Sequence, residues 1–182
     1  MTLHRAYPRK HERGFTMLEV LIAVLVFSLG MLGLAGLLIF AIQSNHVAYL
    51  RTQATFLAHN MAARMSANQV GLWGNGTTSD YNVTAIDPVG TPVPTCAAPG
   101  CSPADLATRD IAAWSQQLHT FLPNAAATIA CATTGIAHVP PAAQFGLSPP
   151  YGGTCTMTIS WNEATSNTGA QEPHSFEWVF QP

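Results

Sequence analysis

Apolar residues follow two different patterns along the first third of the chain. From Phe15 to Ile42 the run is apolar on all sides, and its only polar side chains are Thr16, Glu19 and Ser28. About 28 residues at ~1.5 Å each give ~42 Å of helix, which is enough to cross a ~30 Å hydrocarbon core. The pattern therefore predicts a membrane-spanning helix over residues 15–42.

After residue 42 the pattern becomes amphipathic. Apolar residues recur at three- and four-residue steps along one stripe: Val47, Leu50, Ala54, Leu57, Ala58, Met61 and Met65. Glycines at 71, 74 and 76 then end the pattern. We predict one helix of about 54 residues, from Phe15 to about Asn68, whose second half (43–70) packs its stripe on a head. The alternative is two helices with a break at residues 43–45.

The remaining segment, 71–182, has the size of one small domain. Residues 71–102 are rich in Gly, Pro, Thr and Asn, which predicts a loop with at most a short strand. Ser102 and Pro103 provide an N-cap and a first helical residue, with Asp105 in the first turn. The helix that follows carries a buried stripe and stops at Pro123: Leu106, Ile111, Trp114, Leu118 and Phe121.

Three strands are predicted after that helix, over Ala127–Thr133, Thr154–Asn162 and Ser175–Gln181. In the second and third, large apolar residues alternate onto one face: Cys155, Met157, Ile159 and Trp161, then Phe176, Trp178 and Phe180. Residues 134–153 form an irregular, proline-rich excursion. The fold class is α+β, with a small antiparallel sheet laid on the amphipathic half of the long helix.

Charge is distributed unevenly along the chain. The first fourteen residues hold four of the seven basic residues against one acid. A basic flank of this kind stays in the cytoplasm, so the head faces the other side of the membrane. Beyond residue 14 the chain has three arginines, no lysine and eight acidic residues, a side-chain charge of −5. Such an acidic head argues against direct nucleic-acid binding, which needs clustered cations.

Glu19 is a lone carboxylate within the apolar run, where a charge marks a function. The window Arg13-Gly14-Phe15-Thr16-Met17-Leu18-Glu19 resembles the leader junction of type IV pilins. The resemblance implies a type IV pilin-like fold and cleavage between Gly14 and Phe15 by a prepilin peptidase. It also implies N-methylation of Phe15. A plain signal-anchor is the alternative.

Cleavage would leave a positive amine on Phe15, four residues from Glu19. The carboxylate could pair with this amine within one chain. The better-motivated partner is the amine of an adjacent subunit, because a charge that moves from lipid into a packed filament needs a counter-ion. We therefore assign Glu19 to subunit assembly.

Gly30, Gly33 and Gly36 interrupt the membrane segment. Each is less favourable than alanine in a helix by about 1 kcal/mol. One interpretation is close packing against neighbouring helices. The other is a stretch that unwinds locally when filament replaces lipid.

Four cysteines lie in the head and none in the membrane segment. An even count in an exported domain predicts two disulfides. Of the three possible connectivities we favour Cys96–Cys101 and Cys131–Cys155, because the first closes a tight loop and the second joins neighbouring strands. A four-thiolate zinc site is the alternative, but Cys131 and Cys155 are too far apart in sequence for a typical ligand pair.

The seven histidines are scattered, and no catalytic or phosphate-binding motif is present. We expect no metal, no cofactor and no enzymatic activity.

The head also resembles a particular family, the PilV minor pilins, or type IV pilus modification proteins. Matching residues close the long helix, and others follow in the head: Arg64, Met65, Ala67, Asn68, Cys96, Cys101, Asp110, Trp114 and Trp161. The resemblance implies a minor pilin that helps start pilus assembly at or near the filament tip. It also implies an inner-membrane location with a periplasmic head before incorporation.

The same resemblance implies partners, namely the other minor pilins, the major pilin and the inner-membrane assembly platform. A minor pseudopilin of a type II secretion system is the main alternative. A tip adhesin displayed on a pilin stalk is less favoured, because about 110 residues leave little room for a binding head.

Overall fold

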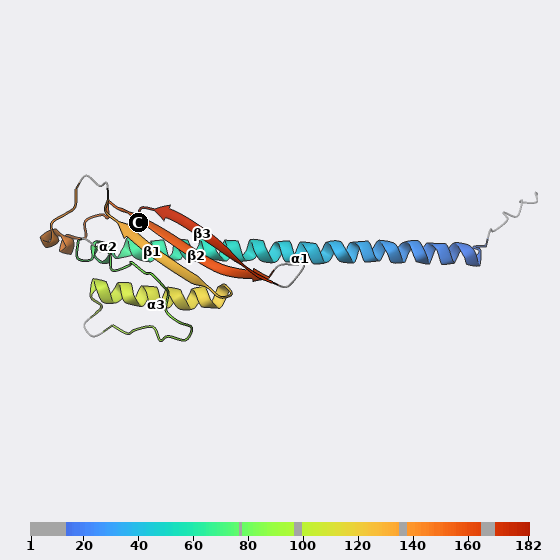
Figure 1. The fold of residues 1–182 in the computed structure, drawn as a ribbon, viewed down its shortest axis with the longest axis horizontal. Helices are drawn as coiled ribbons and strands as arrows, with labels where there is room; N and C mark the ends of the chain where they lie inside the picture. The colour runs from blue at the N-terminus through green and yellow to red at the C-terminus, as the bar shows by residue number, and fades with distance from the viewer. Residues whose placement is uncertain (1–13, 77, 97–99, 135–137, 165–169) are drawn as a thin grey trace, which may run out of the picture. The chain divides into compact units, whose positions relative to one another are not determined.

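The computed structural model describes residues 14–76, 78–96, 100–134, 138–164 and 170–182 (Figure 1). Its elements, in chain order, are α1 (Met17–Ala67), α2 (Gln69–Trp73), α3 (Pro103–Phe121), β1 (Ala126–Ala132), the 3₁₀ helix η1 (Ala142–Leu147), β2 (Thr154–Ala164) and β3 (Gln171–Phe180). The chain divides into two compact units, one that ends at Ser44 and one that runs from Asn45 to Pro182. Most of the expected leader, residues 1–13, lies outside the described residues.

The long helix forms as one element, and the two-helix alternative is wrong because α1 continues through residues 43–45. It begins two residues after Phe15, since Thr16 occupies the capping position. The sequence wrongly predicts a loop directly after it, where the short helix α2 lies instead. The Asn68 side chain accepts a hydrogen bond from the Gly71 N–H at 3.1 Å, which starts a new helical turn.

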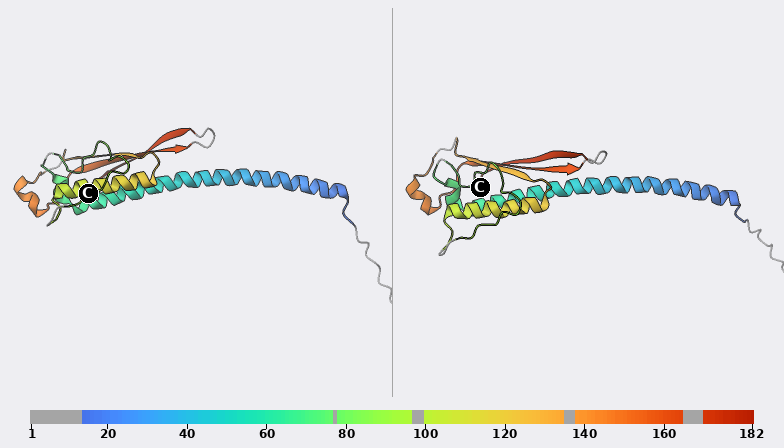
Figure 2. Two further views of the ribbon diagram at one scale, coloured as in Figure 1. Left: turned by 90° about the horizontal axis from the view of Figure 1, so that it is seen from below. Right: turned by 60° about the horizontal axis from the view of Figure 1, so that its bottom comes forward.

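The core of the second unit lies on the amphipathic half of α1. The predicted stripe is buried there, together with one alanine beside it: Leu50, Ala54, Leu57, Ala58, Met61, Ala62 and Met65. Val47, at its start, is half-buried. Within this unit α3 lies alongside α1 (Figures 1 and 2). The Trp114 indole N–H donates to the Leu57 carbonyl at 3.0 Å. Burial of this stripe supplies the hydrophobic stabilisation that a helix of ordinary propensity lacks.

The stripe of α3 differs from its prediction at three positions. Trp114 and Leu118 are fully buried, but Leu106 and Ile111 are half-buried and Phe121 is 43% exposed. The reason is that α3 ends at Phe121, so the chain leaves the helical path there. Leu122, the next residue, turns inward in its place and is 2% exposed. The cap prediction is confirmed, because the Asp105 N–H donates to Ser102 Oγ at 3.1 Å.

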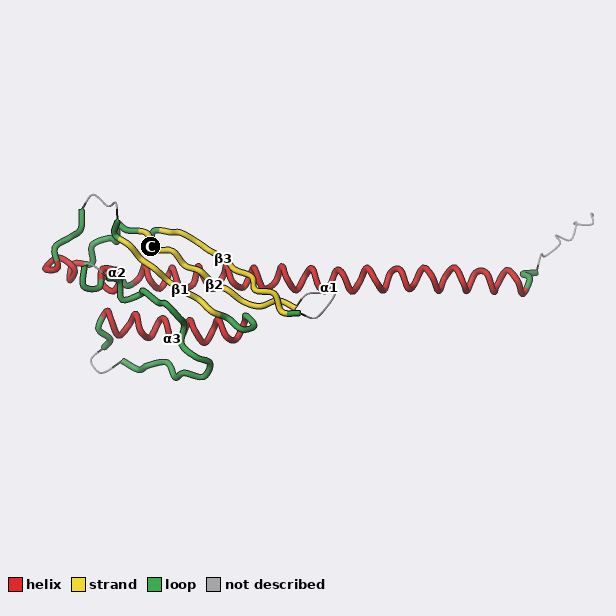
Figure 3. The backbone as a smooth tube through the Cα atoms, viewed as in Figure 1, coloured by secondary structure: helices red, strands yellow, loops and turns green. Residues whose placement is uncertain are grey.

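The three strands form an antiparallel sheet in the order β1-β2-β3, which confirms the α+β fold (Figure 3). The inward residues of β2 are all buried: Cys155, Met157, Ile159 and Trp161. β3 begins four residues before the predicted Ser175 and includes Pro173. A proline is tolerated there because β3 is an edge strand. The excursion contains the 3₁₀ helix η1, which places Phe145 against Trp73 with ring centroids 5.8 Å apart.

Candidate processing and assembly site

The predicted cleavage junction lies in non-helical chain just before α1. Gly14 and Phe15 are both exposed, and the Phe15 side chain is 83% exposed. A Cβ atom added at Gly14 would meet no other atom within 4 Å. A peptidase needs an accessible peptide outside regular structure in order to bind the bond between these residues.

Thr16 starts the helix through its backbone and its side chain. Its carbonyl accepts from the N–H groups of Glu19 and Val20 at 3.1 and 3.3 Å, and its hydroxyl accepts from the Glu19 N–H at 3.3 Å. Thr16 is therefore the N-cap and Glu19 the third helical residue. Reasoning from the sequence missed this role, although a threonine followed three residues later by glutamate is the capping-box signature.

Glu19 consequently lies in the first turn of α1, where the helix dipole favours a negative charge by about 0.3–1 kcal/mol. Within the described part of the chain, its carboxylate has no hydrogen-bond or ion-pair partner. Apolar side chains of its own helix and of the residue before the cap surround it: Phe15, Val20, Ala23, Val24 and Phe27. The result is an anionic group set within an apolar surface, open to a partner from outside the chain.

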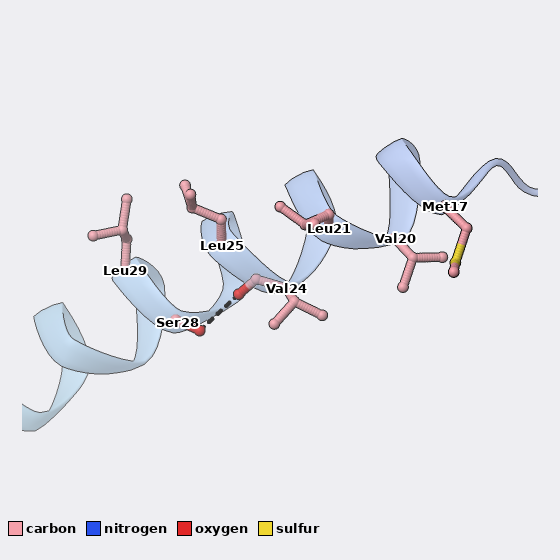
Figure 4. A pocket seen from close by; sticks show the side chains of 7 residues that line it. All are labelled: Met17, Val20, Leu21, Val24, Leu25, Ser28 and Leu29. Carbon is pink, nitrogen blue, oxygen red and sulfur yellow. Dashed lines mark hydrogen bonds between the residues drawn. The ribbon is translucent and has the colours of Figure 1, made fainter.

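The rest of the first unit presents apolar side chains in every direction. All residues from Gly14 to Ile42 are exposed in the isolated chain. On one side a shallow groove follows α1 from Met17 to Leu29, bounded by this helix alone (Figure 4). Its one polar member, Ser28, donates its hydroxyl proton to the Val24 carbonyl at 2.7 Å and so leaves the surface apolar. One helix of the described structure is long and apolar enough to cross a membrane, and it is α1.

No close contact within the chain requires glycine at the three positions in the membrane segment. Apart from the adjoining residues and the backbone of its own helix, a Cβ atom added at Gly30, Gly33 or Gly36 would meet no atom within 4 Å. α1 continues through all three with helical geometry. The isolated chain therefore offers no steric reason for glycine at these positions.

In the second unit, polar residues that the sequence places far apart meet at the end of α1. Arg64 Nη1 lies 3.2 Å from Asp110 Oδ1, and Arg64 Nε donates to Asn60 Oδ1 at 2.9 Å. The Tyr81 hydroxyl donates to the other oxygen of Asp110 at 2.9 Å. Desolvation raises the pKa of Tyr81 well above its ordinary value, so this phenol remains a donor.

Asn68 extends the same network. Its amide nitrogen donates to the Tyr81 hydroxyl at 3.1 Å and to the Pro103 carbonyl at 2.8 Å. The network therefore connects α1, α2, α3 and the loop that carries Tyr81. Arg64, Asn68 and Asp110 are among the residues on which the resemblance to minor pilins rests, and the structure brings them together. Tyr81 is a member that the sequence offered no signal for.

The four cysteines form two disulfides, Cys96–Cys101 and Cys131–Cys155. This is the connectivity that the sequence favours over the alternatives. Cys131 and Cys155 are directly opposite each other in the β1–β2 ladder, with Cα atoms 4.0 Å apart. Among the described residues, no three histidine, cysteine, aspartate or glutamate side chains are placed to hold a metal ion.

Comparison with known protein families gives a match within the first unit. A family model described as the prokaryotic N-terminal methylation motif matches residues 9–35. The matched segment contains Gly14, Phe15 and Glu19, together with Gly30 and Gly33. No curated protein and no solved structure matched the chain. The motif supports a type IV pilin-like protein of a pilus or a pseudopilus, which is processed by a prepilin peptidase and assembles with other pilins.

Proposed function

We propose that the protein is a minor pilin of a type IV pilus that supports the initiation of pilus assembly at or near the filament tip. The observation that carries this proposal is the Glu19 carboxylate, unpartnered within the described chain, in the first turn of an apolar helix that begins directly after a processing junction. A carboxylate at that position is explained if another subunit supplies its counter-ion.

Processing comes first in the proposed sequence of events. The basic leader holds the N-terminus in the cytoplasm while residues 15–42 span the inner membrane and the head lies in the periplasm. The peptidase cuts between Gly14 and Phe15 and methylates the new amine. The amine of Phe15 and the carboxylate of Glu19 then provide one positive and one negative group within the first turn of α1.

Assembly follows when α1 leaves lipid for the filament. The Glu19 carboxylate pairs with the Phe15 amine of a neighbouring subunit, and pairing in a low-dielectric core favours the correct axial register. A misplaced subunit leaves a buried charge unpaired, which costs about 3–5 kcal/mol. The partners are the other minor pilins, the major pilin and the inner-membrane assembly platform.

The side of α1 that faces away from its buried stripe supports an assembly role for the second unit as well. Tyr49 and Phe56 lie seven residues apart and therefore on one face, with exposed fractions of 50% and 64%. Large exposed aromatic side chains on one face of a helix are typical of a surface that another protein covers.

The head supports a minor pilin over a displayed adhesin. The residues on which the family resemblance rests, Arg64, Asn68 and Asp110, belong to one bonded network at the end of α1. The family resemblance therefore involves residues that attach the head to the helix. The competing function, a minor pseudopilin of a type II secretion system, uses the same junction and helix.

The test compares Glu19→Ala and Glu19→Gln with the native chain in the cells that produce it. We expect normal expression, membrane insertion and cleavage in both variants. Both should nevertheless lose most of their incorporation into sheared surface pili, because Glu19→Gln keeps the shape of the side chain but not its charge. Mass spectrometry should give Phe15, methylated, as the mature N-terminus.

Normal incorporation of Glu19→Ala would remove the proposed role of the carboxylate. Native protein that is absent from sheared pili but required for secretion of a type II substrate would favour the pseudopilin.

A further inference from the structure

The two edges of the sheet differ in whether other segments form hydrogen bonds with them. The outer edge of β1 is covered, because Val83 and Ile129 exchange two backbone hydrogen bonds at 2.8 Å and the Cys131 N–H donates to Asn82 Oδ1 at 2.7 Å. β3 forms the opposite edge, and its described residues have no backbone hydrogen bond except to β2. In Figures 1 and 2 no described element runs along the side of β3 that faces away from β2.

The register identifies the backbone groups that face this open edge. The backbone N–H and C=O groups of Ile129 bond to Val83, on the side of β1 that faces away from β2. Met157 is paired with Ile129 across the ladder, so its own backbone groups point away from β1 and bond to β3. Met157 pairs with Trp178, and therefore Trp178 uses its N–H and C=O groups on β2. The alternate residues of β3 direct their backbone groups outward: Gln171, Pro173, Ser175, Glu177 and Val179. Pro173, which has no N–H, occupies one of these outward positions.

The inner face beneath the open edge is incompletely covered. The inward side chains of β1 are buried, with Ala127 and Ile129 at 4% and 2% exposure. Those of β3 are only half-buried, and they include three aromatic residues: Phe176, Trp178 and Phe180. Near the start of β3 a cavity of about 280 Å³ separates the strand from α1, and Arg51 of α1 lines it.

We propose that the open edge of β3 receives an extended segment from a different subunit of the same assembly, by addition of a fourth strand to the sheet. The incoming strand bonds to the outward backbone groups of Ser175, Glu177 and Val179. Its inward side chains cover Phe176, Trp178 and Phe180, as a neighbouring strand would. This inference rests on the proposed function, since it names the contact through which the head joins its neighbours.

Charge distinguishes the occupant from a second copy of this chain. Glu177 lies on the outer face of β3 and Glu172 near the start of the strand. Two copies paired along this edge would place two Glu177 carboxylates on the same outer face of one sheet, in chains that each carry −5 beyond residue 14 with these glutamates included. Like charges opposite each other on one face of a sheet are destabilising. The occupant is therefore a strand from another subunit with neutral or basic side chains opposite Glu177.

A matched pair of photo-crosslinking positions tests the proposal in the full-length chain. Val179 and Ala130 both pair with Thr156, on opposite sides of β2, so they belong to one cross-strand row at the open and the covered edge. With benzoylphenylalanine at each position in pilus-producing cells, we expect Val179 to crosslink to one other pilin and Ala130 to give no such product. Peptide sequencing of the product should place the crosslink in an extended segment of that pilin.

A backbone test runs in parallel. Val179→Pro removes one outward N–H without touching the β2 ladder, whereas Val179→Thr keeps it and suits a strand. We expect Val179→Pro to reduce incorporation into sheared pili about five- to tenfold and Val179→Thr to leave it unchanged. A near-UV circular dichroism spectrum like that of the native chain shows for each variant that the head folds.

Three results overturn the inference: no Val179 crosslink while the native chain is present in sheared pili, a crosslink to a second copy of the chain, or native incorporation of a folded Val179→Pro. Absence of the native chain from pili instead overturns the proposed function.

Discussion

The two halves of α1 are one continuous helix, but different surroundings account for them. In the half up to residue 42, every side chain is exposed in the isolated chain. In the half from Asn45 to Ala67, one stripe is buried. Near the end of this half, Arg64 forms an ion pair with Asp110 of α3. The same helical geometry therefore leaves its side chains open to the surroundings in one half and packs one stripe into the chain's own core in the other.

The contrast extends to the acidic residues. Asp110 in the head has two partners, Arg64 and Tyr81, at 3.2 and 2.9 Å. Glu19 has none within the described residues. A partnered carboxylate stabilises the fold that supplies its partner, whereas an unpartnered one in an apolar surface has its effect when something binds there. This difference distinguishes residues that stabilise the head from those that we propose act in assembly, and four substitution experiments test it.

The largest change in the stability of the head is expected from a buried leucine, compared with an exposed leucine as its control. Leu57 is 1% exposed in the head half of α1, and Leu25 is 55% exposed in the membrane half. Leu57→Ala should destabilise the head by about 2–5 kcal/mol, because it removes buried methyl groups and leaves a cavity. Leu25→Ala should leave head stability unchanged. Thermal unfolding in detergent, followed by near-UV circular dichroism, reports on the head, which contains all four tryptophans. Equal losses from the two variants would mean that the halves are not independent.

The next largest change in stability is expected on removal of the disulfides, which both lie in the head. Replacing Cys131 and Cys155 together by serine should reduce stability by about 3 kcal/mol, because their bond closes a loop with a sequence separation of 24. The same change at Cys96 and Cys101, with a separation of 5, should have a smaller effect of about 2 kcal/mol. Denaturant unfolding without reductant measures both. A greater loss from the shorter loop would show that native-state contacts outweigh loop entropy.

Tyr81→Phe tests the polar network of the head. At neutral pH it should cost about 1–3 kcal/mol, because Asp110 and Asn68 each lose a hydrogen-bond partner. Burial raises the folded-state pKa of Tyr81, so above pH 10, the ordinary value, tyrosine ionises in the unfolded chain but not in the folded one. Native stability should therefore fall as pH rises above about 10. The variant should lose part of this decline. Tyr49→Phe, at an exposed position, is the control at neutral pH, and an unchanged alkaline decline in Tyr81→Phe would exclude this phenol as its cause.

The smallest change in the stability of the isolated chain is expected at Gly33. Gly33→Ala meets no neighbouring atom and should favour the local helix by about 1 kcal/mol, which slower amide hydrogen exchange in micelles would report. Gly71→Ala is the control in the head, where an added Cβ would overlap the Asn68 side chain and destabilise the fold. If glycine at 33 serves assembly, Gly33→Ala should still lower incorporation into sheared pili. Normal incorporation would leave this glycine without a role in packing or unwinding.

Local patterns in the sequence were sufficient for much of the architecture. A long apolar run followed by a stripe at three- and four-residue steps predicts α1, and strict alternation predicts β2. These periods reflect the geometry of helices and strands. The junction around Gly14, Phe15 and Glu19 is also a local pattern. For that reason the sequence predicts this candidate site, and the family model recognises it.

Contacts between distant segments required the tertiary structure. No period in the sequence connects Arg64 with Asp110 or brings Tyr81 to Asp110, because their distances depend on how α3 and the loop that precedes it pack against α1. The exposure of Phe121 and the burial of Leu122 depend on where α3 ends in that packing. The open edge of β3 is likewise decided by strand order, since the backbone of each strand has the same hydrogen-bonding groups and only its neighbours determine which of them remain free.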